Sequence, residues 1–570
     1  MCGLNNKRTA VGIGAVAWML LCAPMAVAVE APIGTDAGTI TRDIQSALPE
    51  GESKPAQINI PSLPPLKATA GLSVSVNQFI VTGNSAFDSE TLEALVASDT
   101  GTQKSFGDLQ AAARKISNYY RENGYPVARA YLPQQELDVS GIVRIAILEG
   151  VTGAVSISGP ETLIDWVGEG YASVLNTGEL VNSPDLERAM LLLNDLPGVH
   201  AKANLKAGAG KGTTDIDISL DAQTEITGFL ALNNYGTDYN GEYRLMGGAS
   251  VNNMIGIGDQ LSAVIMGSDT GDTTYGSLGY SLPVGSLGTR VGFSYSNLDS
   301  EVGEELSVLG IENDAEVFNI NVTHPFIRSR NYNLIAQLGY THKEVKQTFD
   351  DALLADDPTL GSDDDIDILS VGVSGDMRDG LYGGGANTYS ISLDIGDVDF
   401  SNVTNARIDA EDDYVKLNYD FSRTQRVNDK LGLYGHLRGQ FASERLVSSE
   451  QMALGGPNGV RAYGVGEGLG DDATLLTLEA RYRLGFKDES FSLRDSMVYG
   501  FVDAGYSKPN DALAGTPEDY NRSGFGVGVR LGFDHDINLN ASAAFGTRDE
   551  DDAESDGNKH IWIQLVKSFN

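Results

Sequence analysis

Apolar and polar residues alternate with a period of two in a series of short segments that fills residues 223–570. This period predicts β-strands that have one apolar and one polar face. In residues 476–486 the apolar face holds leucine and tyrosine, whereas the polar face holds Glu479 and Arg481. Residues 433–441 follow the same pattern. Charges on one face and aromatic residues on the other are typical of strands that separate a wet lumen from lipid.

The region 223–570 therefore predicts a transmembrane antiparallel β-barrel. Its 348 residues are enough for about 16 strands of about 10 residues plus loops. The periodicity alone indicates only that the strands are many. The last predicted strand places four apolar residues on one face: Ile561, Ile563, Leu565 and Phe569.

Two units of about 75 residues precede the alternating region, at residues 71–150 and 151–222. Each is predicted to contain a strand, helices and then two more strands. In the first unit the helix is predicted to end at Gly124, because glycine favours the left-handed conformation that follows a helix. In the second, Ser183 and Pro184 predict a cap followed by a first-turn proline. The predicted strands are 75–81, 127–132 and 142–148, then 154–158, 199–205 and 215–220.

The N-terminal region has its own composition. Residues 1–28 combine two basic residues, an apolar run and Ala26-Val27-Ala28, which is typical of a cleaved secretory signal peptide. Residues 29–70 are predicted to hold one short helix, around 41–48, followed by a proline-rich stretch that is either an extended linker or a disordered tail. Both cysteines of the chain lie within the signal peptide, so no disulfide is expected after it.

Charge and hydropathy exclude several classes of protein. The chain has 78 Asp and Glu against 40 Lys and Arg, which argues against a nucleic-acid-binding protein. No apolar run of about 20 residues follows the signal peptide, so no transmembrane helix is expected. Residues 208–213 are glycine-rich but lack the spacing of a phosphate-binding loop. The six histidines show no metal-ligand spacing. We expect no enzyme activity, no cofactor and no metal.

Two short motifs near the C-terminus carry the most specific chemistry. Arg461 of the motif at residues 454–464 lies between two glycine clusters, Gly455-Gly456 and Gly464–Gly470, which allow a tight loop in a confined space. Residues 499–505 contain Asp503 in an alternating strand. Because Val498, Val502 and Ala504 fall on the lipid face of that strand, Asp503 is predicted to point into the lumen. A lumenal carboxylate needs a cation, and Arg461 is the candidate partner.

These motifs resemble the signatures of the Omp85 superfamily of outer-membrane transporters, and the closest type is the two-partner secretion transporter (TpsB type). The resemblance covers roughly residues 70–570. It implies 16 barrel strands and a loop that folds back from the cell surface into the barrel. The implied site residues are Val460, Arg461, Tyr463 and Gly464 in that loop, with Phe501, Asp503 and Gly505 in the strand. Ala462 departs from the family pattern, which usually has glycine there.

The two N-terminal units resemble tandem POTRA domains, with the POTRA pattern strongest in the first unit. Its matching residues are Gly83, Asn84, Gly124 and Tyr125. The second unit matches less sharply. The resemblance implies that both units lie in the periplasm and that the helix near residues 41–48 plugs the barrel at rest.

The resemblance implies a transporter that recognises an unfolded exoprotein partner, expected to be a large β-helical adhesin or haemolysin, and moves it to the cell surface. The other expected partners are outer-membrane lipid and the barrel-assembly machinery. An insertase of the same superfamily is the main alternative, but such proteins usually carry three or five POTRA units. A diffusion porin would leave the two units unexplained, and an outer-membrane enzyme lacks a nucleophile and base.

Two acidic runs, at residues 350–367 and 549–556, fall where hairpins are expected to protrude. We expect solvated loops there. Contact with divalent cations or with a partner at the cell surface is the alternative.

Overall fold

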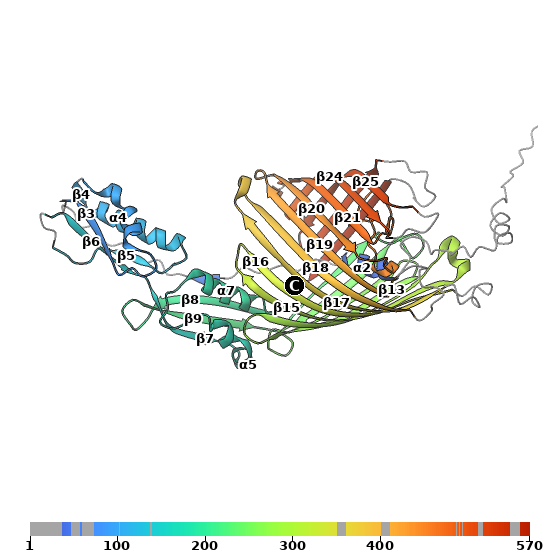
Figure 1. Cartoon of the computed structure of the whole chain (residues 1–570), viewed down its shortest axis with the longest axis horizontal. Coiled ribbons are helices and arrows are strands. Elements are labelled where there is room, and N and C mark those ends of the chain that lie inside the picture. Colours follow the sequence, from blue (N-terminus) through green and yellow to red (C-terminus); the bar gives the residue numbers. More distant parts are fainter. Residues whose placement is uncertain are drawn as a thin grey trace, which may run out of the picture.

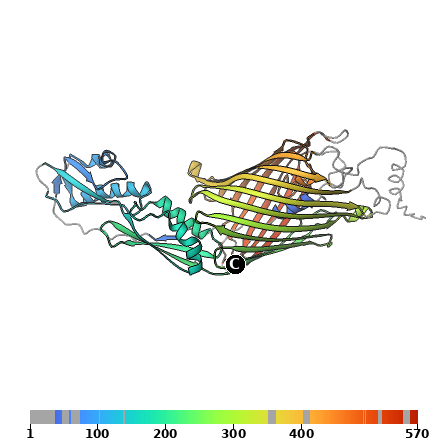
Figure 2. The same ribbon diagram turned by 60° about the horizontal axis from the view of Figure 1, so that its bottom comes forward.

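The computed structural model describes most of the chain and consists of a barrel with two small units at one end (Figures 1 and 2). The described residues are 37–46, 57–59, 73–101, 103–136, 140–349, 361–400, 411–485, 487–488, 491–492, 494–510, 517–547 and 559–569. The predicted signal peptide, most of the predicted linker and the acidic run at 549–556 lie outside them.

Sixteen strands within the described residues form a closed antiparallel barrel, as predicted. The last strand, β27, pairs with the first, β10, so no strand edge is left open to lipid. The strands are β10 (Glu225–Asn233), β11 (Arg244–Asn252), β12 (Gln260–Ser268), β13 (Thr273–Val284), β14 (Thr289–Glu301), β15 (Ile311–Arg328), β16 (Asn333–Phe349), β17 (Ser362–Asp379), β18 (Gly385–Phe400), β19 (Asp413–Arg426), β20 (Leu431–Ala442), β21 (Asp472–Arg483), β24 (Arg494–Lys508), β25 (Tyr520–Phe533), β26 (Ile537–Gly546) and β27 (Lys559–Phe569). A two-stranded hairpin, β22 (Lys487–Asp488) and β23 (Phe491–Ser492), lies between β21 and β24.

The alternation assigns the two faces of the barrel wall correctly. On β24, Val502 is 54% exposed on the outer face, whereas Asp503 beside it is 1% exposed on the inner face. Leu478 on β21 and Ile563 on β27 are exposed on the outer face in the same way. Apolar side chains outside and polar ones inside fit a lipid-facing wall around a polar lumen. Among the described residues, no helix has the length and apolar character needed to span a bilayer.

The first unit has a three-stranded sheet of order β3-β6-β5 and two α-helices. Its elements are β2 (Ser73–Ser75), β3 (Gln78–Thr82), α3 (Ser89–Ala94), η1 (Ala97–Asp99), β4 (Gln103–Ser105), α4 (Phe106–Glu122), β5 (Arg129–Tyr131) and β6 (Ile142–Leu148). Helix α4 begins with a capping box of Ser105 and Asp108. It ends before Gly124, whose φ of 93° explains the requirement for glycine.

The second unit repeats this plan with a four-stranded sheet of order β1-β8-β9-β7. Its elements are β7 (Val151–Ser158), α5 (Glu161–Leu163), η2 (Ile164–Gly168), α6 (Glu169–Ala172), α7 (Ser183–Asn194), β8 (Val199–Ala207) and β9 (Thr213–Ala222). The predicted cap of α7 was wrong by one residue. Asn182 is the cap, because its side chain accepts a hydrogen bond from the amide of Asp185 at 2.8 Å.

Strand β1 (Gln57–Asn59) comes from the predicted linker and pairs in parallel with β8. The linker was predicted to be extended, and in this stretch it is, but it also adds a strand to the sheet. Because β1 covers one edge, β7 is the outer strand on the other side.

The POTRA-like motif residues organise the core of the first unit. Gly83 has a φ of 84°, and a Cβ atom there would lie 2.5 Å from the carbonyl oxygen of Ile147. The Asn84 side chain donates to the carbonyl of Phe87 at 2.8 Å. The Tyr125 ring packs edge-on against Phe87 with 5.6 Å between ring centroids.

The turn after Gly83 also binds a buried carboxylate, Glu149. The amides of Ser85 and Ala86 donate to its Oε1 at 2.7 and 2.8 Å, and the hydroxyl of Tyr120 does so at 2.7 Å. Burial alone would raise the pKa of Glu149, but these hydrogen bonds to the charged form outweigh it and lower the pKa below its usual value near 4.5.

Helix α2 (Ala37–Ser46) lies inside the barrel (Figure 1). It begins four residues earlier than predicted. Its Ile40 and Ile44 are completely buried and belong to one apolar cluster with inward residues of the barrel wall. The helix contacts β14, β15 and β16, and also η5 (Ser448–Glu450) in the segment between β20 and β21.

One acidic run differs from the prediction of a loop. Residues 362–367 belong to β17 and continue the barrel wall. Residues 350–360 of that run lie outside the part of the chain that the structure describes.

Glu149→Gln is expected to destabilise the first unit at neutral pH but to matter less in acid. Because the folded-state pKa of Glu149 is lowered, its contribution is complete above the unfolded pKa and is lost as pH falls through the folded pKa. Hydrogen exchange of full-length protein, followed for peptides around residues 79–87 and 142–149 from pH 7 downward, measures this. Glu122→Gln, at an exposed position of α4, is the control. Equal protection of these peptides from hydrogen exchange in the wild type, Glu149→Gln and Glu122→Gln would show that the Glu149 carboxylate does not stabilise the unit.

Ile44→Asp is expected to raise the ionic conductance of the purified barrel in planar bilayers, because a charge cannot replace an apolar contact with the wall and α2 should leave the lumen more often. Gln45→Asp adds the same charge at an exposed position of the same helix and serves as the control. Unchanged conductance for Ile44→Asp would show that the helix does not close the barrel.

Candidate functional site in the barrel lumen

The segment between β20 and β21 folds into the lumen instead of extending outward. Leu454, Val460 and Tyr463 are at most 1% exposed. The fold of this loop depends on close backbone approaches. A Cβ atom on Gly455 would lie 2.0 Å from the carbonyl oxygen of Gly464. The glycines that the sequence singled out are therefore needed for backbone packing.

Arg461 sits at the tip of this loop and binds Asp503 on β24 through two parallel hydrogen bonds. Its Nε and Nη2 each donate to one carboxylate oxygen of Asp503 at 2.8 Å. The backbone amide of Arg461 adds a third bond at 3.2 Å. Thr477 on the neighbouring strand β21 donates to Asp503 at 3.0 Å. The structure thus brings together the two residues that the sequence paired.

Glu479 is a second carboxylate partner of Arg461 that the sequence reasoning missed. The Nη1 of Arg461 donates to its Oε1 at 2.8 Å. Its other oxygen accepts from Nε of Arg481 at 2.8 Å, and Arg530 lies 3.6 Å away. The alternation already placed Glu479 on the lumenal face. Pairing Thr477 with Asp503 across the sheet, as observed, would have shown that Glu479 lies within reach.

Two aromatic side chains, Phe501 and Tyr499, pack against the guanidinium of Arg461. The Arg461 guanidinium lies over the Phe501 ring, with 3.5 Å from its central carbon to the ring centroid, a favourable cation–π arrangement. Tyr499, two residues earlier, donates its hydroxyl to Asn540 at 3.0 Å. Both rings are 4% exposed. Phe501 therefore contributes directly to the site as part of the predicted strand motif.

A row of glycines on β25 makes room for this layer. Cβ atoms on Gly524, Gly526 and Gly528 would lie 2.3 to 2.7 Å from Ala462, Phe501 and Tyr499 respectively. The i, i+2, i+4 spacing of these glycines is visible in the sequence, and its meaning becomes clear only once β24 and β25 are paired. The Ala462 methyl, the one departure from the family pattern, is accommodated at Gly524.

The remaining predicted residues also pack here. Gly505 faces Val460 and Leu454 of the loop, and a Cβ atom there would lie about 3.0 Å from both side chains. Gly464 donates its amide to Glu467 at 2.7 Å. Three strands further along the wall from β24, Trp562 on β27 donates its indole N–H to the carbonyl of Arg461 at 2.7 Å.

The start of the lumenal segment is attached to the wall by a separate ionic group. Glu450 is 2% exposed and accepts from Lys343 on β16 and Lys416 on β19, each at 2.5 Å. Helix α2 contacts this same segment, η5. A cavity of about 150 Å³ remains beside Arg461, and Glu479 is among its lining residues. Helix and loop therefore occupy the lumen together.

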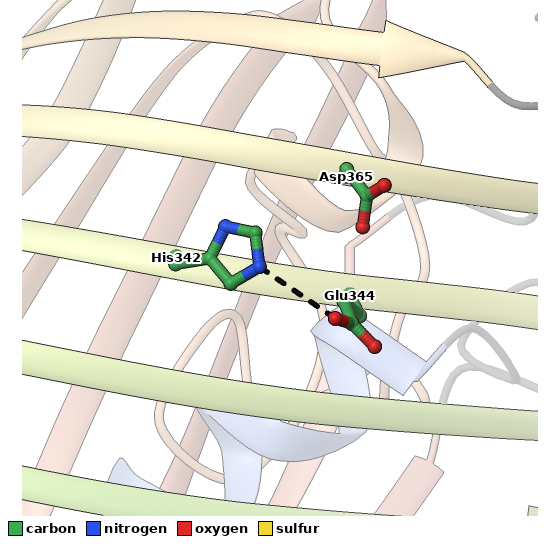
Figure 3. Close-up of side chains that lie close together, drawn as sticks. All are labelled: His342, Glu344 and Asp365. Atoms are coloured by element: carbon green, nitrogen blue, oxygen red, sulfur yellow. Dashed lines mark ion pairs between the residues drawn. The ribbon is translucent and has the colours of Figure 1, made fainter.

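A different titratable cluster lies on the outer face of the barrel (Figure 3). Ligand atoms of His342, Glu344 and Asp365 lie within 4.8 Å of one another, a proximity that the histidine spacing did not predict. His342 is 3.6 Å from Glu344 and 2.9 Å from Asp367. The ion pair with Glu344 accounts for two of the three residues, and the Glu344 side chain is 58% exposed. The POTRA-like motif residues lie in the first unit and are not part of the lumenal site.

Arg461→Met is expected to destabilise the barrel by about 3–5 kcal/mol, because it leaves two buried carboxylates without their shared cation. Adding Asp503→Asn and Glu479→Gln should restore part of the loss, since neither buried carboxylate then carries a charge. Arg481 and Arg530 lose Glu479 as a partner, but their side chains are 17% and 38% exposed. The stability of both variants is measured as the temperature at which half of the detergent-solubilised barrel changes from its folded to its unfolded electrophoretic mobility. Arg426→Met removes a 64% exposed arginine side chain as the control. A triple variant no more stable than Arg461→Met would rule out unpaired charge as the cause.

Comparison with known proteins agrees with this architecture. A model of the family described as haemolysin secretion/activation protein ShlB/FhaC/HecB matches residues 212–531, and a ShlB-type POTRA domain model matches residues 74–150. The heme/hemopexin transporter protein HuxB of Haemophilus influenzae is 26% identical, with 94% of this chain and 95% of HuxB covered.

Two solved structures have the same fold. CdiB from Escherichia coli matches with a TM-score of 0.64 and 19% identity over 93% of this chain and 95% of its own. BamA from Haemophilus ducreyi lacking POTRA domains 1–3 matches with a TM-score of 0.54 and 14% identity over 87% of this chain and 100% of its own. The family model covers more than half of this chain and the sixteen-stranded barrel agrees with it, so the chain belongs to the ShlB/FhaC/HecB family of outer-membrane two-partner secretion transporters.

Proposed function

We propose that this transporter exports one dedicated exoprotein, which residues 71–150 and 151–222 capture unfolded in the periplasm as two POTRA domains. The observation that carries the proposal is a lumen filled by α2 and the Arg461 loop, in a barrel with two α/β units at one end (Figure 1). A barrel for diffusion of small solutes needs neither the units nor such a plug.

Capture would use strand addition, in which backbone hydrogen bonds bind an extended chain with little demand on its sequence. The sheet of the first unit ends in β3 on one side and β5 on the other. In the second unit β7 is an outer strand, while β1 covers β8. Three sheet edges are therefore candidates for binding the exoprotein.

We assign separate roles to the site residues. Arg461, held by Asp503, would keep the loop in the conformation that the open barrel needs. The packing of the loop against the wall would depend on its residues Val460, Tyr463 and Gly464 and on the strand segment Phe501–Gly505. The passage itself would be polar, because the inner wall is polar over most of the barrel. Transport would involve no catalytic step of the chain and would draw on folding of the exoprotein outside the cell.

The exoprotein is proposed to be a large β-helical adhesin or haemolysin. Such a partner folds progressively as it emerges, which would prevent its return. The barrel-assembly machinery is a second proposed partner, because β27 presents Ile563, Leu565 and Phe569 on its outer face near the chain end. The BamA-type insertase is the less favoured function, since two units and a plug helix fit the secretion transporters better.

Deleting the protein is expected to remove one large exoprotein from the culture supernatant and to leave other outer-membrane barrels at normal levels. Wild-type protein should restore secretion. Arg461→Ala should reach the membrane but secrete poorly, and Arg426→Ala should behave as wild type because that side chain is exposed. The proteins of the culture supernatant and of the outer membrane are compared in four strains: the deletion strain, and the deletion strain carrying wild type, Arg461→Ala or Arg426→Ala.

Two outcomes of this experiment would contradict the proposal in different ways. A general fall in outer-membrane barrels with an unchanged supernatant would make the protein an insertase. Full secretion by Arg461→Ala at normal barrel levels would remove the loop's role and leave the transporter function intact.

A further inference from the structure

Trp166 is an exposed tryptophan next to the barrel. It is 51% exposed and lies in η2, a single π-helical turn between α5 and α6. The neighbouring Leu163 and Val167 are completely buried in the core of the second unit. Isolated π-turns of this kind occur frequently at functional sites. Here the turn directs a large amphipathic ring away from the core.

The helical segment 161–172 rests on two turns at the periplasmic end of the barrel. The Trp166 indole N–H donates to the carbonyl of Pro283 at 3.3 Å. The Thr162 hydroxyl lies 3.5 Å from the carbonyl oxygen of Gly256. A Cβ atom on Gly170 would lie 1.9 Å from Cβ of Ser286. This segment therefore touches the turns that follow β11 and β13.

Those same turns carry large apolar side chains exposed to solvent. Met254 and Ile255 are 43% and 58% exposed, and Leu287 is 52% exposed. Val284, at the end of β13, is 43% exposed and has the same parity as the lipid-facing Leu278. The apolar patch formed by Trp166 and these four residues is therefore continuous with the lipid-facing wall of the barrel.

The second unit is held in this position by polar contacts on its other helix. Asp195, which follows α7, accepts two hydrogen bonds at 2.7 Å from the Arg328 guanidinium on β15. Arg188 on α7 donates to the carbonyl of Pro325 at 2.9 Å. These contacts, together with those of segment 161–172, fix where Trp166 lies relative to the barrel wall.

We propose that segment 161–172 rests on the periplasmic leaflet of the outer membrane, with the Trp166 indole in the phospholipid headgroup layer. Tryptophan prefers this layer because its ring is apolar and its N–H is polar. The exposed side chains of the two turns, Met254, Ile255 and Leu287, lie in the same layer. Membrane contact would then orient the second unit and present its free edge, β7, toward the periplasm.

The charges beside Trp166 decide which phospholipid it fits. Asp165 and Glu169 are both exposed on this segment, and anionic headgroups would be repelled by them. The ammonium group of phosphatidylethanolamine is attracted to them instead. The proposed partner is therefore a zwitterionic phospholipid surface.

Tryptophan fluorescence of the full-length protein tests this directly. The chain has three tryptophans: Trp18 in the predicted signal peptide, Trp166, and Trp562, which is 6% exposed inside the barrel. The mature protein, reconstituted in nanodiscs of phosphatidylethanolamine and phosphatidylcholine, is measured with and without lipids that carry a spin label near the headgroup. Trp166→Phe is measured in parallel to isolate the contribution of Trp166.

We expect the spin-labelled lipid to quench a large part of the emission of the wild type, and this part to be absent from Trp166→Phe. Quenching by aqueous iodide but not by labelled lipid would overturn the proposal, because the ring would then lie in water. Protection from both quenchers would also overturn it and would place the ring against protein. Lipid quenching only when phosphatidylglycerol is added would overturn the headgroup assignment.

Discussion

The arrangement of the lumen depends on one buried guanidinium. Arg461 reaches Asp503 and Glu479 on two adjacent strands and lies over Phe501, so a single side chain ties the loop tip to β21 and β24. A buried ionic group of this kind contributes less net stability than its contacts suggest, because each charge loses its hydration. Its effect is geometric. The guanidinium is planar and its N–H donors point in fixed directions, so it can bind both carboxylates in only one orientation of the loop. A lysine at this position could not bridge both carboxylates in the same way.

The inner surface that surrounds this group is not uniformly polar. Inward residues of the barrel wall such as Val345, Ile366 and Ile368 are buried in a cluster with Ile40 and Ile44 of α2. The alternation rule predicts polar residues on that face, and the apolar stretch found there is the surface that α2 covers in this structure. Helix α2 covers it by apolar contact, whereas the Arg461 loop is held both by charge and by an apolar cluster that contains Leu454, Val460 and Tyr463. Among the described residues, the two elements that fill the lumen thus differ in that only the loop has a buried ionic attachment to β21 and β24.

The features that could be predicted from the sequence are those that depend on the local pattern of residues, such as the strands and their two faces. Strand faces followed from period two, which placed Asp503 on the lumenal face opposite to Val502. The pairing of Arg461 with Asp503 was implied by the resemblance to the transporter family. The contact of Glu479 with Arg461 was not predicted, because the register between two strands cannot be read from the sequence of one strand. The role of Gly524, Gly526 and Gly528 was not predicted for the same reason. The start of α2 and the strand β1 were missed because both form only against other parts of the molecule. Asn182 replaced Ser183 as the cap because both residue types favour that position, and only the observed hydrogen bond distinguishes them.

Helix and loop are also connected through the wall. Helix α2 contacts η5, and Glu450 of η5 is fixed by Lys343 and Lys416. The same segment continues to Leu446, Val447 and Val465, which share the apolar cluster of α2. Departure of the helix would therefore expose apolar atoms of both the wall and the loop base, while the contacts of Arg461 with β21 and β24 could remain. Since the ionic contacts do not depend on the helix, the loop can stay attached to the wall as the lumen opens. The part of the lumen that α2 leaves is the part through which a chain could pass, with the Arg461 loop at its side.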